Sequence, residues 1–451
     1  MKSTKLTLLL AFPLVALISC KKEISRQQEH TIKELDKSKI YKLPETSEEK
    51  LLVDNLTKVT AVLKNLYKNK ENLKLVNAAL FSKAYTDQSV PLKDLIYPEA
   101  SRLTVISKFN KYAAKFDVSL NQFSNNFWHE VSKLNDASFN QFLNNLKPVN
   151  RSANLRTETF DENGDDVTIY FPYMEEFLEP IDETGGYYEP ITSVVTATAD
   201  ADEGWGEQPY YINGVFQYYV QVLVNDDYAE NYPTHIVGVN GIEPYNEPPI
   251  ANSAFPPGGP VDLPNLPREV KQVYVGDVRC KTQYDALISF TGNGGGSEIR
   301  FTRADGFLKL ADGQVQADMF VVGDASISRY SIRKRNWVNY SKEWDGDWED
   351  INFQENLAIY EEDNRNTSTF TGSLSTTAAI TVAPAVITAT RTIGFTLNFK
   401  SDDALIKQTN YNRDVFFILN RTDLEGEMKD GWPVRDRYAN VSFTLNDRTY
   451  Y

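Results

Sequence analysis

The sequence contains only two cysteines and three histidines among its 451 residues. Two cysteines cannot build a disulfide framework or a cysteine-based zinc site. The histidines, His30, His129 and His235, lie in three separate regions, so we do not expect them to meet at one metal ion. HExxH, GxSxG and the glycine-rich P-loop are also absent. These absences argue against catalysis of the usual metal, triad or nucleotide type.

The mature part of the sequence also lacks a long apolar run and any excess of positive charge. The full sequence has 47 basic and 62 acidic residues, which gives a formal net charge of -15. Such a chain repels a phosphate backbone, so we expect no nucleic-acid partner. Hydrophobic residues make up 41% of the chain, with 25 Tyr and 24 Phe. This composition excludes a disordered chain and favours a large β component in two to four domains.

The first twenty residues have the pattern of an export signal. Lys2 and Lys5 precede an apolar stretch, 6–18, that is too short to cross a bilayer. The stretch ends in Leu17-Ile18-Ser19-Cys20, which resembles the lipobox of bacterial lipoproteins. The resemblance implies removal of residues 1–19 and acylation of Cys20, which together change the charge from -15 to -17 because two lysines are lost. The alternative is an ordinary secretory signal.

The residues after Cys20 bear on location. Lys21 stands where an aspartate would retain a lipoprotein in the inner membrane, and Lys21-Lys22-Glu23 resembles the export segment of Bacteroidota lipoproteins. We therefore expect an outer-membrane protein that is anchored through Cys20 and faces the cell surface, with the periplasmic face as the alternative. Acyl chains anchor a protein by burying CH₂ groups in the bilayer.

Hydrophobic periodicity predicts a multidomain α+β protein. Thr46 and Glu49 form a capping-box pattern before an amphipathic helix. Beyond residue 155 the period changes to two, which indicates strands. Eight of the twenty prolines lie within 24 residues, which predicts a semi-rigid connector. The predicted segments are a signal peptide (1–19), a lipid-anchored tether (20–45), a small helical domain (46–150), a β-rich module (152–243), a Pro-rich connector (244–268) and an antiparallel β-sandwich (269–451).

Individual strands are predicted from alternation and β-branched content. The stretch 218–224 is expected to be well buried. The candidates in the two β regions are 167–171, 218–224, 234–239, 273–278, 286–290, 298–301, 318–322, 358–361, 378–391, 396–400 and 415–419.

A cluster of acids in the C-terminal region suggests a calcium site. The segments 344–350, 356–364 and 370–372 combine carboxylates with an aromatic-x-Gly, and they resemble the calcium-loop region of C2-type β-sandwiches. Calcium takes six to eight oxygen ligands, which acidic loops supply. Solvated acidic loops are the alternative. The candidate ligands are Asp345, Asp347, Asp350, Glu361, Glu362 and Asp363.

Three further features admit two interpretations each. Cys280 lies between two cations that would lower its pKa, or it is a half-buried inert thiol. Trp337, Trp344 and Trp348 could stack on sugar rings, or they fill the core. The third feature is a basic cluster, which is predicted to be a solvated strand face or a contact for anionic headgroups: Arg329, Arg333, Lys334 and Arg335.

The whole architecture resembles the large set of uncharacterised lipoproteins of Bacteroidota. The segments that carry the resemblance are the lipobox, the helical segments 62–69 and 73–80, and the strand 233–241. The resemblance implies a location and no activity. We expect a non-catalytic module that binds an extracellular glycan or an envelope protein, or that has a structural role. A surface hydrolase of glycan or peptide with a carboxylate-based site is the alternative.

Overall fold

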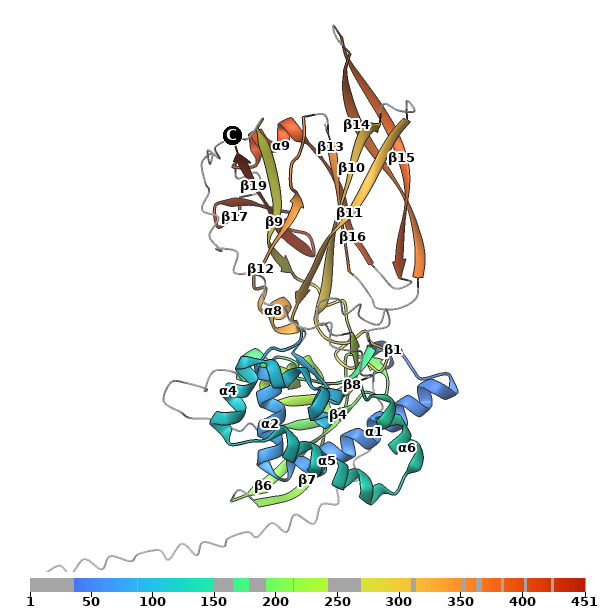
Figure 1. Cartoon of the computed structure of the whole chain (residues 1–451), viewed down its shortest axis with the longest axis vertical. Coiled ribbons are helices and arrows are strands. Elements are labelled where there is room, and N and C mark those ends of the chain that lie inside the picture. Colours follow the sequence, from blue (N-terminus) through green and yellow to red (C-terminus); the bar gives the residue numbers. More distant parts are fainter. Residues whose placement is uncertain are drawn as a thin grey trace, which may run out of the picture.

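The computed structural model describes two halves that follow each other along the longest axis of the molecule (Figure 1). Helices and a mixed sheet form one end, and long antiparallel strands form the other. The N-terminal half here means the described residues up to 241, and the C-terminal half those from 269. The described residues are 36–450 without 87, 149–164, 178–191, 214, 242–268, 310–313, 351, 353, 362–366, 383–384, 401–403 and 423–425.

The predicted helical region is confirmed. Thr46 accepts a hydrogen bond from the Glu49 amide while the Glu49 carboxylate accepts one from the Thr46 amide, so the predicted capping box starts the first helix. The helices are α1 (Ser47–Tyr67), α2 (Lys70–Phe81), α3 (Leu92–Ile96), α4 (Ser107–Phe116), α5 (Leu120–Leu134) and α6 (Ala137–Asn145), with 3-10 turns η2 (Pro98–Ala100) and η3 (Arg102–Val105).

A six-stranded sheet packs against these helices in the order β2-β3-β8-β4-β6-β7. Strands β4 and β8 run parallel, and the other pairs of this sheet are antiparallel. Its members and their connecting elements are β2 (Ser89–Pro91), β3 (Asp165–Tyr170), η4 (Met174–Phe177), β4 (Ser193–Thr196), β5 (Asp200–Ala201), β6 (Gly204–Ile212), β7 (Val215–Val224), α7 (Asp226–Asn231) and β8 (Thr234–Gly241).

One hydrophobic core joins the helices to this sheet. Leu56 and Val59 of α1, Phe127 of α5 and Ile169 of β3 belong to the same buried cluster. The predicted boundary near residue 150 therefore does not separate two cores. The helical segment and the β-rich segment form one α+β unit, because each element buries its apolar side against the other.

Strand β7 differs from its prediction. It was expected to be well buried, but it is the edge strand of the sheet, and Tyr218 and Val220 are exposed. The register pairs Tyr210 with Tyr218, whose rings stack at 5.0 Å. Tyr219, one position along, donates to the Lys64 carbonyl of α1. Neighbouring positions on a strand face opposite sides, so α1 contacts the face of β7 that carries Tyr219, while Tyr218 and Val220 on the other face are exposed.

The C-terminal half is the predicted antiparallel β-sandwich. A four-stranded sheet, β11-β10-β13-β16, and a five-stranded sheet, β12-β9-β19-β18-β17, share a second buried cluster. The strands are β9 (Val270–Cys280), β10 (Ser297–Lys309), β11 (Gln314–Ile327), β12 (Val338–Asp345), β13 (Gln354–Glu361), β14 (Thr367–Val382), β15 (Ala385–Lys400), β16 (Ala404–Asn412), β17 (Met428–Lys429), β18 (Trp432–Arg435) and β19 (Val441–Tyr450), with helices α8 (Arg329–Lys334) and α9 (Arg413–Leu419).

Three predictions of strand structure for the C-terminal half were wrong, and one predicted strand is two strands. The stretch 415–419 lies in helix α9, which Asn412 caps by accepting from the Val415 amide. The stretch 378–391 is divided between β14 and β15, which pair antiparallel. The stretch 286–290 makes only isolated bridges. The basic cluster forms helix α8 and not a strand face, because Ser328 caps a turn of helix there.

The last ten residues of the predicted tether lie on the body of the protein. A 3-10 turn, η1 (Lys37–Lys39), leads into β1 (Ile40–Lys42), which pairs with β5. Asp36 donates its amide to Glu203 at 2.7 Å. The signal peptide, Cys20, the first part of the tether and the Pro-rich connector lie outside the described residues. Within the described ranges, no helix has the length and apolar character needed to cross a membrane.

Candidate functional site

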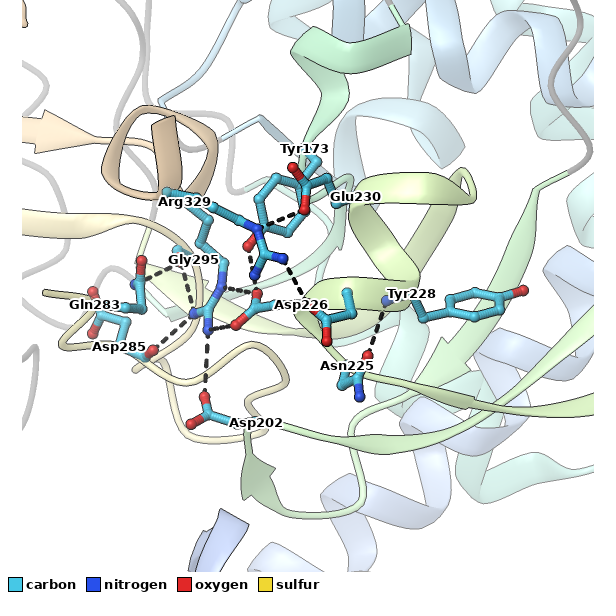
Figure 2. Close-up of polar contacts among 12 residues, drawn as sticks. Tyr173, Asp202, Asn225, Asp226, Tyr228, Glu230, Gln283, Asp285, Gly295 and Arg329 are labelled. Atoms are coloured by element: carbon cyan, nitrogen blue, oxygen red, sulfur yellow. Dashed lines mark hydrogen bonds and ion pairs between the residues drawn. The ribbon is translucent and has the colours of Figure 1, made fainter. Parts of the chain in front are cut away.

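A cluster of ion pairs and hydrogen bonds lies between the two halves (Figure 2). Helix α8 of the C-terminal half supplies cations, and helix α7 of the N-terminal half supplies acids. We call this cluster the joint. It consists of Arg329, Arg333 and Lys334 with their partners Glu176, Asp202, Asp226, Asp227 and Glu230.

Arg329 is at the centre of the joint, with a side chain only 1% exposed. Its Nε and Nη2 donate to the two carboxylate oxygens of Asp226 at 2.8 and 3.1 Å. Nη2 also reaches Asp202 at 3.3 Å, and Nη1 donates to the carbonyls of Asp285 and Gly295 at 2.8 and 3.3 Å. A guanidinium has five N–H donors, and each has an acceptor here. The chain therefore satisfies a buried cation completely.

Burial and pairing act in opposite directions on the charges of the joint. Burial alone would raise the pKa of Asp226, but Arg329 and the Tyr173 hydroxyl, which donates at 2.7 Å, hold that pKa below its ordinary value. Burial lowers the pKa of Arg329, and Asp226 more than offsets this, so that pKa is raised. Both groups therefore stay charged, as a bidentate pair requires.

A second layer of ion pairs surrounds this pair on the surface. Arg333 contacts Asp227 and Glu230, each at 2.5 Å. Lys334 contacts Glu176 at 2.6 Å and Glu230 at 2.9 Å. These pairs are partly exposed, and exposed ion pairs contribute little to stability because water and salt screen them. They fix the orientation of α8 against α7 more than they stabilise it.

A loop of the C-terminal half enters the N-terminal core beside the joint. Asp200 accepts hydrogen bonds from Ser289 Oγ and the Phe290 amide, both at 2.9 Å. Ile288 bridges to Ala201, and both Ile288 and Phe290 belong to the N-terminal hydrophobic cluster. A Cβ at Gly238 would meet the Ser289 carbonyl at 2.3 Å, so only glycine allows this approach. The loop fastens the two halves by apolar contacts as well as by charge.

The cations of the joint were singled out from the sequence, but their acidic partners were not. The acidic run Asp226-Asp227-x-x-Glu230 follows Asn225, which caps α7 by accepting from the Tyr228 amide. An Asx cap followed by acids in the first turn is a helix-start signal, and it could have been identified. This acidic run faces Arg329, which lies 103 residues later in the sequence. No local sequence pattern contains such a tertiary contact.

Replacing Arg329 tests the joint. Arg329→Met leaves Asp226 buried without its counter-ion, so we expect the free energy of unfolding to fall by about 3–5 kcal/mol. The matched control is Arg333→Met, on the same helix but exposed, which should cost about 0–1 kcal/mol. Urea unfolding followed by tryptophan fluorescence measures both. Equal effects of the two substitutions would contradict a central role for Arg329.

The predicted calcium ligands do not gather at one point among the described residues. Asp345 pairs with Arg303 at 2.7 Å, and Asp350 pairs with Arg413 at 2.6 Å. Glu361 lies four positions from Leu357, the register partner of Arg303, which is about 13 Å along a strand. Asp347 donates its amide to Asp345 in a local turn. Glu362 and Asp363 lie outside the described residues.

Glu361 instead meets two acids that the sequence analysis did not consider. Oxygen atoms of Asp285, Glu298 and Glu361 lie within 4.8 Å of one another, with Asp285 and Glu361 buried. In the described parts of the chain, this is the group of three whose spacing suits a metal ion. Carboxylate oxygens are the ligands of calcium. Calcium binding therefore stays a prediction. Glu361 remains a candidate ligand, and Asp285 and Glu298 are its new neighbours.

Calcium binding can be tested on the mature full-length chain. If Glu361 helps to hold the ion, millimolar Ca²⁺ raises the melting temperature, and Glu361→Gln removes most of that increase. Asp350→Asn is the control, because Asp350 is already paired with Arg413. Differential scanning fluorimetry with Ca²⁺ and EDTA measures the shift. An unchanged melting temperature in the unaltered chain would remove the calcium hypothesis.

Cys280 and two of the tryptophans are core residues. Burial raises the pKa of the Cys280 thiol to about 11, and Sγ donates to the Thr282 carbonyl. Of the two interpretations of Cys280, these observations favour the inert thiol, because Arg279 pairs with Glu427 and Lys281 donates to the Ala439 carbonyl. Trp344 and Trp348 are buried and pack edge to face at 5.4 Å. Trp337 lies under the Arg279 guanidinium at 4.3 Å.

His235 is a buried base in the N-terminal core. Its ring is fully buried between Tyr67 and Phe171, and Nδ1 lies 2.9 Å from the Tyr67 hydroxyl. Nε2 has no hydrogen-bond partner among the described residues. Burial lowers the pKa of His235 to about 3. His129 lies exposed on α5, so these two histidines do not share a site.

The depressed pKa of His235 predicts an acid-sensitive stability. Between about pH 3 and 6.5 the unfolded chain binds a proton at this residue and the folded chain does not, so stability falls as the pH falls through that window. The slope from one such group is about 1.4 kcal/mol per pH unit. His235→Asn keeps an acceptor for Tyr67 and should remove that slope. Urea unfolding at pH 4, 5, 6 and 7 measures it; identical slopes in both chains would disprove the assignment.

Comparison with known proteins gave no match at three levels. No family model matches the chain, and neither does any curated protein or solved structure. The function therefore has to be inferred from the residues and their geometry.

Proposed function

We propose that the chain is a lipid-anchored protein of the bacterial envelope that acts without catalysis, as a binding or structural module. The observation that carries this proposal is the joint, together with the N-terminal Cys20. Arg329 and the loop 285–295 connect the two halves through a satisfied buried cation and a shared core. A body held at one end by lipid and rigid along its length presents its far end at a defined orientation.

The burial of the side chains that could take part in catalysis supports a non-catalytic role. The Cys280 thiol is protonated and buried, and His235 is sealed in the core. The cluster of three carboxylates formed by Asp285, Glu298 and Glu361 favours the hydrolase alternative. Two of these three residues, however, are buried and do not face a substrate. The non-catalytic proposal therefore ranks above the hydrolase.

The proposed partners are an extracellular glycan or an envelope protein, besides the membrane at Cys20. Trp344 and Trp348 are buried, so they offer no sugar platform. Aromatic surface is present instead at Tyr210 and Tyr218, whose stacked rings are 46% and 54% exposed. Aromatic rings with a free hydroxyl suit both kinds of partner.

Substituting Cys20 tests the anchor. Several acyl chains hold a protein stably in the membrane. Cys20→Ala removes the acylated residue, so we expect the chain to move from the membrane fraction to the soluble fraction of the cell. Immunoblots of fractionated cells measure the distribution, and protease treatment of intact cells reports whether the anchored chain faces outward. The control is Ser19→Ala, which leaves the cysteine in place.

Retention of the Cys20→Ala chain in the membrane fraction would contradict the proposed lipid anchor at Cys20. If the anchored chain is protected from protease in intact cells but cleaved after the outer membrane is opened, the periplasmic orientation replaces the surface one.

A further inference from the structure

Strand β7 is an open edge of the six-stranded sheet. In the order β2-β3-β8-β4-β6-β7 it pairs with β6 on one side. Among the described residues, no strand and no isolated bridge pairs with its other side. An edge strand presents unpaired N–H and C=O groups that can bind a further strand. Figure 1 shows β6 and β7 at the end of the molecule opposite the C-terminal sandwich.

Strand β7 lacks most of the features that protect a sheet edge. Natural edge strands are kept from pairing by charged side chains, proline, short length or a bulge. The ten residues of β7, 215–224, contain no charged residue and no proline, although the chain has 62 acids. A bulge is present, because one register shift leaves Gln217 without an opposite residue on β6. Beyond it, 218–224 pairs with 204–210 without a further shift, so this part of the edge is regular.

Helix α1 holds this edge strand in place from one face of the sheet. The Tyr219 hydroxyl donates to the Lys64 carbonyl of α1 at 2.7 Å. The Tyr219 ring lies 4.9 Å from the Phe216 ring, and Lys68 Nζ of α1 lies 5.3 Å from the centroid of Phe216. A partner that binds an ordered strand avoids the entropy cost of ordering it. The edge is therefore preorganised for pairing.

Exposed apolar side chains gather on the same hairpin. Apolar residues that lie singly on a surface are ordinary, but a contiguous group marks a site of interaction. Strand β7 contributes Val215, Tyr218 and Val220, and β6 contributes Tyr210 and Ile212. Tyr210 and Tyr218 are opposite each other in the register and stack. The hairpin therefore combines an open edge with an apolar surface.

Charge and symmetry favour a second copy of the chain as the occupant of this edge. The net charge of -15 makes two copies repel each other wherever their acidic surfaces meet. Pairing of β7 with β7 brings two uncharged strands together instead. A two-fold axis presents the same edge from both copies and makes the pair antiparallel, so the outward N–H groups of each strand meet the C=O groups of the other.

The opposite edge of the same sheet limits this assembly to two copies. Strand β2, Ser89–Pro91, has three residues, and all three are buried. Helices α2 and α3 contact it, and Pro91 has no N–H to offer a further strand. A sheet with two open edges would add copies without end, whereas one open edge closes after a single pairing.

We propose that two copies of the chain pair antiparallel through β7, about a two-fold axis at Val220, and join their six-stranded sheets into one. Val220 is the centre of 218–222, the part of the regular edge that precedes the buried Val224. This register places Tyr218 of each copy opposite Val222 of the other. The stacked tyrosines of both copies then lie on one continuous face, which deepens the proposed binding role by making it bivalent.

Sedimentation of the mature chain from Lys21 to Tyr451, prepared without lipid, tests the dimer. We expect a reversible equilibrium of monomer and dimer at micromolar concentrations. Val220→Lys places two ammonium groups opposite each other at the axis, where like charges are destabilising, so it should raise the dissociation constant about tenfold or more. The matched control is Ile212→Lys, which makes the same charge change at an exposed position of β6, one strand away from the edge. Circular dichroism and thermal unfolding check that both variants fold.

Either of two sedimentation results would overturn the proposal. The first is a monomer in the unaltered chain up to about 100 μM, a concentration at which even a weak dimer forms. The second is a dimer that Val220→Lys weakens no more than Ile212→Lys does, which would place the contact elsewhere. The chain used carries no lipid, so neither result bears on the proposed anchor at Cys20.

Disulfide cross-linking tests the register. Residues directly opposite each other in an antiparallel pair have Cβ atoms about 4.5–5.5 Å apart, which is close to the reach of a disulfide. Val220→Cys should therefore form a covalent dimer under mild oxidation, and Ile212→Cys should not. Cys280 is buried and does not compete. Non-reducing gel electrophoresis measures the product. Equal cross-linking of the two variants, or none at position 220, would contradict an axis at Val220.

Discussion

The buried pair of Arg329 and Asp226 determines how the rest of the molecule is arranged. Isolated charges are expensive to bury, and this pair is tolerated because each N–H of the guanidinium has an acceptor drawn from both halves. The acceptors come from α7, from the turn between β5 and β6, and from the loop before β10. These bonds depend on the placement of both halves, so the pair favours this orientation.

The inserted loop and the joint support each other. Ile288 and Phe290 add apolar burial to the N-terminal core, while Asp285 and Gly295 at the ends of the same loop offer carbonyls to Arg329. Loss of either contact exposes polar groups that the other had covered. The body is therefore best understood as one unit of two cores, which suits a proposed role in presenting its far end at a fixed distance from an anchor.

Local patterns predicted local structure well. The Thr46–Glu49 capping box and the leucine spacing of α1 specify a helix from neighbouring residues alone, and the alternation in β8 and β9 specifies strands. The stretch 329–335 was predicted as a strand face because Arg, Tyr and Ile alternate there. The alternation is coincidental, since the segment forms a short helix. The strand 218–224 misled because its apolar residues lie at an exposed sheet edge, and only the order of strands reveals that.

The candidate sites depended on long-range contacts and were predicted less well. The cations of α8 were identified, but their acids lie about a hundred residues away. Glu361 was a predicted metal ligand, yet its neighbours Asp285 and Glu298 come from another strand and a loop. The sequence left two interpretations of Cys280 open, because charge near it in the sequence does not measure its burial.

A distance measurement between the halves tests the central claim that the joint makes one rigid body. Spin labels at Val105→Cys and Tyr438→Cys occupy positions that are 78% and 84% exposed, one in each half. Double electron–electron resonance should give a single narrow distance distribution in the unaltered joint. A broad distribution, or two resolved distances, would contradict the claim.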